Sequence, residues 1–234
     1  MASQSKSKFA VVTGANRGIG LEVARQLAAA GFHVFLTARD ASKGKAAAAQ
    51  LGKGAEFLEL DVSNAKSIST FVSELSKRAD HLDVLVNNAG VFPDHQTDAL
   101  GLDPELLFEA FRTNTVGPFR LTQALVPLME KADGARVINI SSGLGALSGD
   151  EVIAPAYSVS KTALNAVTRQ FAHALKPKRI IVNSVCPGWV RTDMGGPNAP
   201  RQVEQGADGI RWLATEAPAS ITGKFLRDRK VIDW

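Results

Sequence analysis

The only tyrosine of the chain, Tyr157, is followed four residues later by Lys161. Residues at i and i+4 share one face of a helix, so the phenol and the ammonium group can approach closely. A nearby cation lowers the pKa of a phenol from its usual value of about 10, which favours proton donation. The pair predicts a proton donor, although a packing contact on a helix face explains the same spacing.

Polar side chains follow several apolar runs of the sequence. Ser141 and Ser142 come after the run 135–140, Asp61 follows 55–60, and Asn87 and Asn88 close the run 82–87. A serine at a strand end can hydrogen-bond an oxygen that gains negative charge during hydride transfer, although serines there also form turns. Together these strand ends predict one continuous cleft.

A glycine-rich turn, TGANRGIG at 13–20, separates the first apolar run from an amphipathic segment. Glycines permit a tight turn and let backbone amides and a helix N-terminus approach a pyrophosphate. Three glycines can serve a turn alone, but their place between a strand and a helix favours a dinucleotide site.

The residues after the second strand predict which dinucleotide binds. An NAD site favours a carboxylate there, whereas an NADP site favours a cation for the 2′-phosphate. Arg39 suits a phosphate, and Arg17 in the glycine turn is placed to reach the same group. Asp40 argues for NAD, but it directly precedes the expected helix 41–51, so we expect it to cap that helix. We therefore expect NADP(H).

Strands and helices alternate along the chain, which predicts an α/β fold with a doubly wound parallel sheet of about seven strands and helices on both faces, a Rossmann fold in one domain over 1–234. The expected strands are 8–13, 32–37, 55–60, 82–87, 135–140, 179–185 and, less distinctly, 223–227. The expected helices are 18–30, 41–51, 64–79, 103–131, 156–176 and 201–214.

Composition excludes several classes of function. The 27 basic and 23 acidic residues are scattered, so we expect no nucleic-acid partner, while anionic small molecules remain plausible. No apolar run approaches the ~20 residues of a membrane span, and the N-terminus lacks a signal-peptide pattern. With Cys186 as the single cysteine, expected to be a buried structural thiol, a cytoplasmic location is expected. The four histidines, His33, His81, His95 and His173, have no metal-ligand spacing, so no metal is expected.

Taken in order, these motifs resemble the short-chain dehydrogenase/reductase family over essentially the whole chain. The matching segments are TGxxxGxG at 13–20, NNAG at 87–90, Ser142, YxxxK at 157–161 and the PG turn at 187–188. The segments LTARD at 36–40, GWVRTDMGGP at 188–197, VEQGADG at 203–209 and FLRDRKVIDW at 225–234 are similar to the NADPH-dependent carbonyl reductase branch.

The resemblance implies reduction of an aldehyde or ketone with NADPH. It implies that Ser142 holds the substrate carbonyl, that Tyr157 protonates it, that Lys161 binds the nicotinamide ribose and acidifies the tyrosine, and that Asn114 fixes a water that relays protons to Lys161. The implied cofactor-binding residues are Gly14, Asn16, Arg17, Gly18, Ile19, Gly20, Arg39, Asp61, Val62, Asn88, Ala89, Gly90, Tyr157, Lys161, Pro187, Gly188, Val190 and Thr192.

The chain also departs from the family pattern. The segment between Ser142 and Tyr157 is slightly long and contains Asp150 and Glu151, which we expect at the cleft mouth, either influencing substrate choice or simply solvated. A long insertion that keeps some animal carbonyl reductases monomeric is missing, so a homodimer or homotetramer is expected. Phe92, Trp189 and Met194 either line the substrate pocket or pack.

Two alternatives to carbonyl reduction stay open. The first is a 3-oxoacyl-carrier or thioester reductase of the same family, which would need a basic patch for an acidic carrier. The second is a non-catalytic NADPH-sensing protein, against which the complete set of Ser142, Tyr157 and Lys161 argues. The sequence leaves the physiological substrate, its stereochemistry and the preferred direction undetermined.

Overall fold

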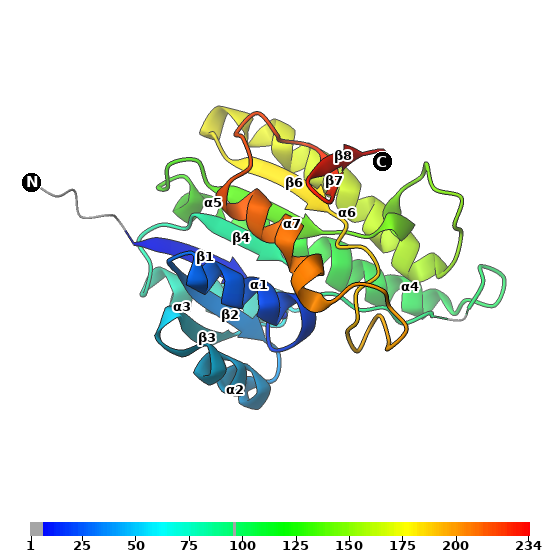
Figure 1. Cartoon of the computed structure of the whole chain (residues 1–234), viewed down its shortest axis with the longest axis horizontal. Coiled ribbons are helices and arrows are strands. Elements are labelled where there is room, and N and C mark those ends of the chain that lie inside the picture. Colours follow the sequence, from blue (N-terminus) through cyan, green and yellow to red (C-terminus); the bar gives the residue numbers. More distant parts are fainter. Residues whose placement is uncertain (1–6, 96) are drawn as a thin grey trace, which may run out of the picture.

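An eight-stranded sheet forms the centre of the computed structural model, which describes residues 7–95 and 97–234 (Figure 1). In spatial order the strands are β3 (Ala55–Glu59), β2 (Phe32–Ala38), β1 (Lys8–Val12), β4 (Val84–Asn87), β5 (Arg136–Ile140), β6 (Ile181–Val185), β7 (Phe225–Arg227) and β8 (Lys230–Ile232). Neighbouring strands are parallel except for β7 and β8, which form an antiparallel hairpin. The carboxyl ends of the seven parallel strands therefore share one edge, where ligands bind in such sheets.

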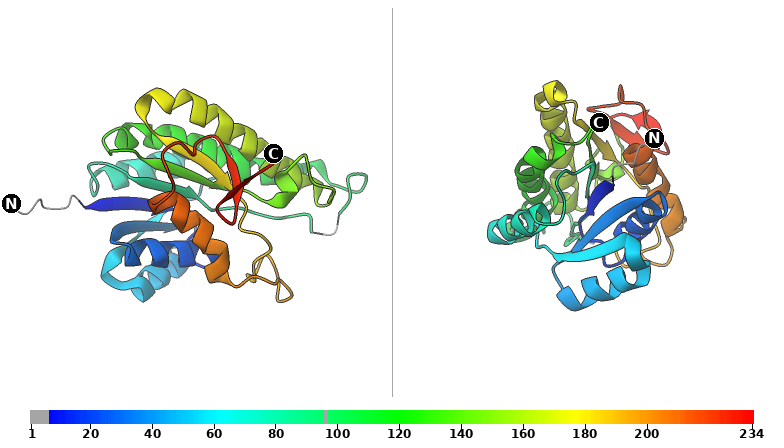
Figure 2. Two further views of the ribbon diagram at one scale, coloured as in Figure 1. Left: turned by 45° about the horizontal axis from the view of Figure 1, so that its top comes forward. Right: turned by 90° about the vertical axis from the view of Figure 1, so that its left-hand side faces the viewer.

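Helices cover both faces of this sheet (Figure 2). The main helices are α1 (Gly18–Ala29), α2 (Ala41–Leu51), α3 (Ala65–Ser76), α4 (Pro104–Phe111), α5 (Gly117–Met129), α6 (Pro155–Ala174) and α7 (Val203–Thr215). Side chains of α1, α2 and α7 join one apolar cluster, and those of α3, α5 and α6 join the other. The sheet separates the two clusters, as in a doubly wound fold.

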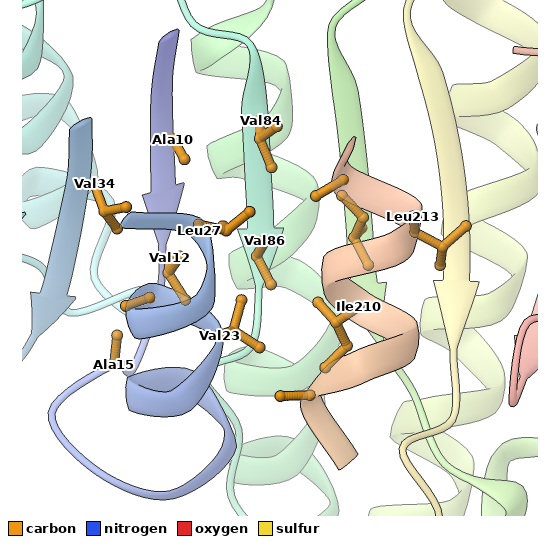
Figure 3. Close-up of a cluster of buried hydrophobic side chains, with 14 of the residues drawn as sticks. Ala10, Val12, Ala15, Val23, Leu27, Val34, Val84, Val86, Ile210 and Leu213 are labelled. Carbon is orange, nitrogen blue, oxygen red and sulfur yellow. The ribbon is translucent and has the colours of Figure 1, made fainter. Parts of the chain in front are cut away.

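The first cluster shows why the strands are rich in valine. Val23 and Leu27 of α1 and Ile210 of α7 lie on the same side of the sheet as Val86 of β4 (Figure 3), and all four are fully buried. Strands of a parallel sheet are covered on both faces, so they carry continuous apolar residues rather than an alternating pattern.

On the other face of the sheet, which α5 and α6 cover, polar side chains interrupt the core in a single row across three strands. Asn87 of β4 is paired in register with Asn139 of β5, which is paired with Ser184 of β6. Asn87 Nδ2 donates to Asn139 Oδ1 at 2.8 Å, Asn139 Nδ2 donates to Thr168 Oγ1 at 2.8 Å, and Thr168 lies 2.7 Å from Ser184 Oγ. All four are buried, so the bonds offset the loss of their hydration.

The structure confirms the predicted Rossmann fold and corrects two details. It has eight strands rather than about seven, because Lys230–Ile232 turns back on β7. The turn is made by Asp228 and Arg229, both with positive φ (51° and 62°), a conformation usually taken by Asn or Gly in two-residue hairpins. The ends of most other elements differ from the prediction by a few residues.

The second correction concerns the predicted helix 103–131. The structure divides it into α4 and α5, joined by a π-helical turn at Arg112–Val116. The wider turn leaves the consecutive residues Asn114 and Thr115 both buried, and Thr115 Oγ1 donates to the carbonyl of Ser160 at 2.8 Å. Such turns often occur at functional sites.

Candidate active site

The glycine-rich turn links β1 to α1 at the ligand-binding edge of the sheet. Gly14 has φ 62°, and a Cβ there would come 2.9 Å from the Cα of Ala89. At Gly20 a Cβ would come 2.4 Å from Asn88 Nδ2. These positions require glycine because the NNAG segment lies directly against the turn.

Hydrogen bonds fix this contact between the two motifs. Thr13 Oγ1 accepts from the backbone N–H groups of Asn88 and Ala89, both at 2.9 Å. Asn88 Nδ2 in turn donates to the carbonyls of Thr13 at 2.8 Å and Gly14 at 3.1 Å. The predicted phosphate turn and the predicted Asn88–Gly90 segment thus form one rigid unit.

A pocket of about 440 Å³ lies beside this unit, lined by Asn16, Arg17, Lys43, Ala46, Ala47, Gln50 and Asp193. The Arg17 guanidinium forms an ion pair with Asp193 there. Arg39 is exposed and has no ion pair or hydrogen bond with the described residues. Lys43 also lines this pocket and was not predicted from the sequence. Its place in the first turn of α2, four residues after Arg39, could have indicated a second cation near the cofactor site.

Asp40 caps the following helix, as the sequence predicted. Its Oδ1 accepts from the backbone N–H of Lys43 at 3.0 Å at the N-terminus of α2. This hydrogen bond lowers the pKa of the Asp40 carboxyl. The carboxylate that argued for NAD therefore has a structural role in the helix.

Ser142, Tyr157 and Lys161 come together at the ends of β5 and α6. The Ser142 side chain lies near enough to the Tyr157 hydroxyl to lower the pKa of the phenol. Lys161 Nζ lies 5.6 Å from the centroid of the Tyr157 ring and donates to the carbonyl of Ile140 at 2.8 Å. The predicted proton donor, its lysine neighbour and the serine are therefore neighbours in space.

Burial dominates the ionisation of this group. It raises the pKa of Tyr157 to about 12, against the lowering effect of the Ser142 side chain. It also lowers the pKa of Lys161 to about 8. The sequence led us to expect a lowered phenol pKa, but the net shift is upward, because the cost of removing the phenolate from water exceeds the lowering by Ser142.

Asn114 lies within the π-helical turn and is fully buried. Its Oδ1 accepts from the N–H of Val91, and its Nδ2 donates to the Val91 carbonyl and to Ser160 Oγ, all at 2.9 Å. A Cβ added to Gly90 would lie 3.2 Å from Asn114 Oδ1 and 3.5 Å from Lys161 Nζ. The structure thus groups Asn114, Gly90 and Lys161, while the role of Asn114 in a water relay stays a prediction.

Asp61 and Val62 lie at the end of β3, on the same edge of the sheet. Asp61 Oδ1 accepts from the backbone N–H of Ser63 at 2.9 Å and from its hydroxyl at 2.7 Å. Val62 is buried against Gly117 at the start of α5, where a Cβ would come 2.8 Å from the Val62 carbonyl oxygen.

The loop after β6 reaches the glycine turn from the other side. A Cβ on Gly18 would lie 3.4 Å from Thr192 Cγ2, and Val190 is buried within the loop. Pro187 and Gly188 begin the loop, with Gly188 at φ 79°. The loop after β6 therefore lies against the glycine turn at the carboxyl edge of the sheet.

The comparisons with known proteins agree with this geometry. The short chain dehydrogenase family model matches residues 8–202. The chain belongs to the short-chain dehydrogenase family. Carbonyl reductase 1 (NADPH) of Sus scrofa is 34% identical, with 98% of this chain and 95% of that protein covered. A (+)-neomenthol dehydrogenase of Arabidopsis thaliana is 33% identical, with 99% and 100% covered. The solved structure of NADPH-bound carbonyl reductase from chicken fatty liver has a TM-score of 0.90 and 30% identity, with 98% and 100% covered.

This short-chain dehydrogenase is thus an oxidoreductase similar to carbonyl reductases, as its motifs predicted.

Cys186 is buried, and its Sγ accepts from Gly188 N at 3.4 Å and from Arg227 Nη2 at 3.2 Å. Trp189 and Met194 are exposed, and Asp150 and Glu151 lie in an exposed loop.

Residues 7–95 and 97–234 of this dehydrogenase contain no cluster of three or more metal-ligating side chains. Within the same residues, no helix has the length and hydropathy of a membrane-spanning segment.

Sequence reasoning missed two contacts of the active-site tyrosine in this dehydrogenase. Asp94 is buried and hydrogen-bonds the start of α6, and Phe92 stacks on the Tyr157 ring. The sequence leaves open whether Phe92 lines the pocket or packs, and nothing in the local sequence marks Asp94, because its partners lie more than 60 positions away.

Proposed function

We propose that this chain reduces aldehyde or ketone carbonyls to alcohols with NADPH, using Tyr157 as the proton donor. The observation that carries the proposal is the grouping of Ser142 and Tyr157 beside buried Lys161, whose Nζ lies 5.6 Å from the Tyr157 ring, at the same sheet edge as the glycine turn. Support comes from relatives named as NADPH carbonyl reductases and from a solved structure that holds NADPH.

The residues present fit NADP(H). The N-terminus of α1 has no side-chain cap, so its backbone N–H groups are available to a pyrophosphate. Arg17 and Lys43 line the neighbouring pocket, and Arg39 lies exposed at the end of β2. This set of cations suits the extra phosphate that distinguishes NADPH from NADH.

When bound, NADPH supplies the hydride. Ser142 would donate a hydrogen bond to the carbonyl oxygen as negative charge grows there, an effect of about 10²–10³-fold for comparable donors. Tyr157 would transfer its proton to that oxygen, which contributes typically ~10²–10⁴-fold. With a pKa of about 12 the phenol is fully protonated at neutral pH, and Lys161, with a pKa of about 8, is mostly charged beside it.

The substrate class can be tested by following cofactor oxidation with aldehydes, ketones, quinones, 3-oxo esters and 3-oxoacyl thioesters, with NADPH and NADH side by side. We expect turnover of free aldehydes or ketones with NADPH and much slower turnover with NADH. Turnover restricted to thioesters would instead identify a 3-oxoacyl reductase. NADPH binding without turnover of any carbonyl would indicate a sensor.

The cofactor preference should depend on Arg39. Replacing Arg39 with Ala is expected to raise KM for NADPH by about 10–100-fold and leave KM for NADH nearly unchanged, because a hydrogen bond to a charged group contributes about 1.5–3 kcal/mol. Initial rates at varied cofactor concentration measure both constants. Arg25→Ala, which removes an exposed guanidinium paired with Glu22, is the matched control. An equal increase in KM for NADPH and for NADH would show that Arg39 does not recognise the 2′-phosphate.

We further propose that the chain forms one domain over 1–234, is cytoplasmic, and assembles as a homodimer or homotetramer through α4, α5 and α6. Both apolar clusters share one sheet, which supports a single domain.

The proposed assembly rests on four large apolar side chains of α4, α5 and α6 that are between 39% and 57% exposed: Phe108, Phe111, Phe119 and Val159. Covering them with a second copy would remove this surface from water. No nucleic acid or membrane partner is proposed.

A further inference from the structure

The N-terminus of α6, the helix that carries Tyr157 and Lys161, has no cap of its own. Its N-cap residue is Ala154, whose side chain cannot accept a hydrogen bond and whose φ of 49° lies in the left-handed region. The first N–H groups of a helix have no acceptor within the helix. Pro155 lacks an N–H, and the N–H of Ser158 already bonds the Ala154 carbonyl at 2.8 Å. The donors left over are those of Ala156 and Tyr157.

Asp94 accepts from both of these donors. Its Oδ2 accepts from Ala156 N at 2.6 Å, and its Oδ1 accepts from Tyr157 N at 3.3 Å. Asp94 is only 1% exposed, and Ala156 and Tyr157 are also buried. Water therefore cannot easily replace either bond. The Asp94 carboxylate, which comes from another segment, therefore caps α6 in place of a residue at the N-cap position.

The same segment also contacts the ring of Tyr157. The Phe92 and Tyr157 rings are stacked with centroids 4.3 Å apart and planes at 18°. His95 stacks on Phe92 in turn, with centroids 3.7 Å apart. Phe92 and Asp94 thus contact the side chain and the backbone of one residue.

The other end of this segment is anchored beside the predicted cofactor site. The amide side chain of Asn114 bonds both the N–H and the carbonyl of Val91, which follows Gly90. The segment 91–94 therefore connects the NNAG motif directly to Tyr157. A displacement at either end would move the phenol relative to Ser142 and Lys161.

We propose that Asp94 is a positioning residue for the proton donor, holding the Tyr157 backbone while Phe92 holds its ring. The inference rests on the proposed function, since it assigns Asp94 a role only through the Tyr157 hydroxyl. Asp94 itself donates no proton and contacts no substrate. Its effect arises because a reacting group must be held in a narrow range of positions.

Two replacements of Asp94 test this role. Asp94→Leu keeps the branched shape without an acceptor, and Asp94→Asn keeps one acceptor oxygen. We expect Asp94→Leu to lower kcat for a ketone by about 10–100-fold, because misplacement by about 1 Å can cost 10²-fold, with a smaller loss for Asp94→Asn. The Kd for NADPH, from fluorescence titration, should stay within about twofold of wild type. Amide hydrogen exchange in the peptide 154–160 should become faster.

The control is another capping aspartate. Asp103 caps α4 through a hydrogen bond from Glu105 N at 3.0 Å and is exposed. Asp103→Leu is expected to lower the melting temperature without changing kcat. If Asp94→Leu lowers kcat and NADPH affinity equally, its role is structural and the proposal is wrong. If Asp94→Leu does not fold, the Asp94→Asn variant tests the positioning role instead. A wild-type kcat for Asp94→Asn would then overturn the proposal.

A double-mutant comparison separates this inference from the proposed function. In a Tyr157→Phe background, Asp94→Leu should cause no further loss beyond about twofold in the residual rate, because the two residues act as one unit. A full additional loss would overturn the positioning role. Unchanged activity of Tyr157→Phe alone would overturn the proposed function. Loss in Tyr157→Phe together with a wild-type kcat in Asp94→Leu would overturn only the role of Asp94.

Discussion

Tyr157→Phe is expected to lower kcat for ketone reduction by about 10²–10⁴-fold, the range that positioned proton transfer contributes. The replacement removes only the hydroxyl, whose pKa the Ser142 side chain lowers. It retains the ring that stacks on Phe92 and lies near Lys161. Steady-state rates with a saturating ketone and NADPH measure the effect.

NADPH binding provides the internal control for this variant. Because the phenyl ring keeps its place, the Kd for NADPH should change by no more than about twofold. A binding loss as large as the rate loss would mean that the replacement disturbs the site rather than the proton transfer. Retained turnover would remove Tyr157 from the mechanism and leave Ser142 or a water as the donor.

Lys161→Met is expected to stabilise the protein while abolishing its turnover. Burial lowers the pKa of Lys161 from 10.5 to about 8, so the folded protein holds the charged form at a cost. One pKa unit corresponds to 1.36 kcal/mol, which gives about 3 kcal/mol for this shift. After loss of the hydrogen bond to Ile140, we expect the free energy of unfolding at pH 7 to rise by about 2 kcal/mol.

The sign of the pH dependence provides a second test of Lys161. Between pH 8 and 10.5 the unfolded chain holds a proton on this lysine that the folded chain has released. The free energy of unfolding of the wild type should therefore rise with pH through this window. Above pH 10 it should fall, because the unfolded chain ionises Tyr157 before the folded chain does so near pH 12. In Lys161→Met, the free energy of unfolding should no longer rise between pH 8 and 10.5, but it should still fall above pH 10.

Urea unfolding followed by tryptophan fluorescence at pH 7 and pH 9.5, without added nucleotide, measures these differences. Lys77→Met removes an exposed lysine that pairs with Glu74 and should leave the pH dependence unchanged. A Lys161→Met variant that is less stable than wild type at pH 7 would show that the buried cation contributes net stability in the folded protein.

The parts of the site predicted from sequence are those set by local spacing. The glycine turn must follow a strand and precede a helix, and Tyr157 and Lys161 share a helix face whatever surrounds them. Their positions at one sheet edge follow from the topology of parallel strands. The helix-capping role of Asp40 was also predictable, because its partner is three residues away.

The missed features depend on contacts between distant segments. Aspartate usually lies at the surface, but Asp94 is buried, and its partners are backbone N–H groups at the start of α6, a helix without a cap of its own. The π-helical turn at Arg112–Val116 packs against Ser160, which propensity along the helix does not reveal. The direction of the Tyr157 pKa shift depends on the burial of its side chain, which the spacing to Lys161 does not reveal.

The polar row of Asn87, Asn139 and Ser184 has a consequence for how the chain reaches this state. A parallel strand made only of valine and isoleucine can slide past its neighbour by one or two residues with little loss of apolar contact. Here a slide would separate Asn139 from its amide and hydroxyl partners inside a dry interior and turn neighbouring side chains to the wrong face. Misaligned pairings of β4, β5 and β6 are therefore less stable than the native register. The native register also places the loops that follow these strands at the same height along the sheet edge.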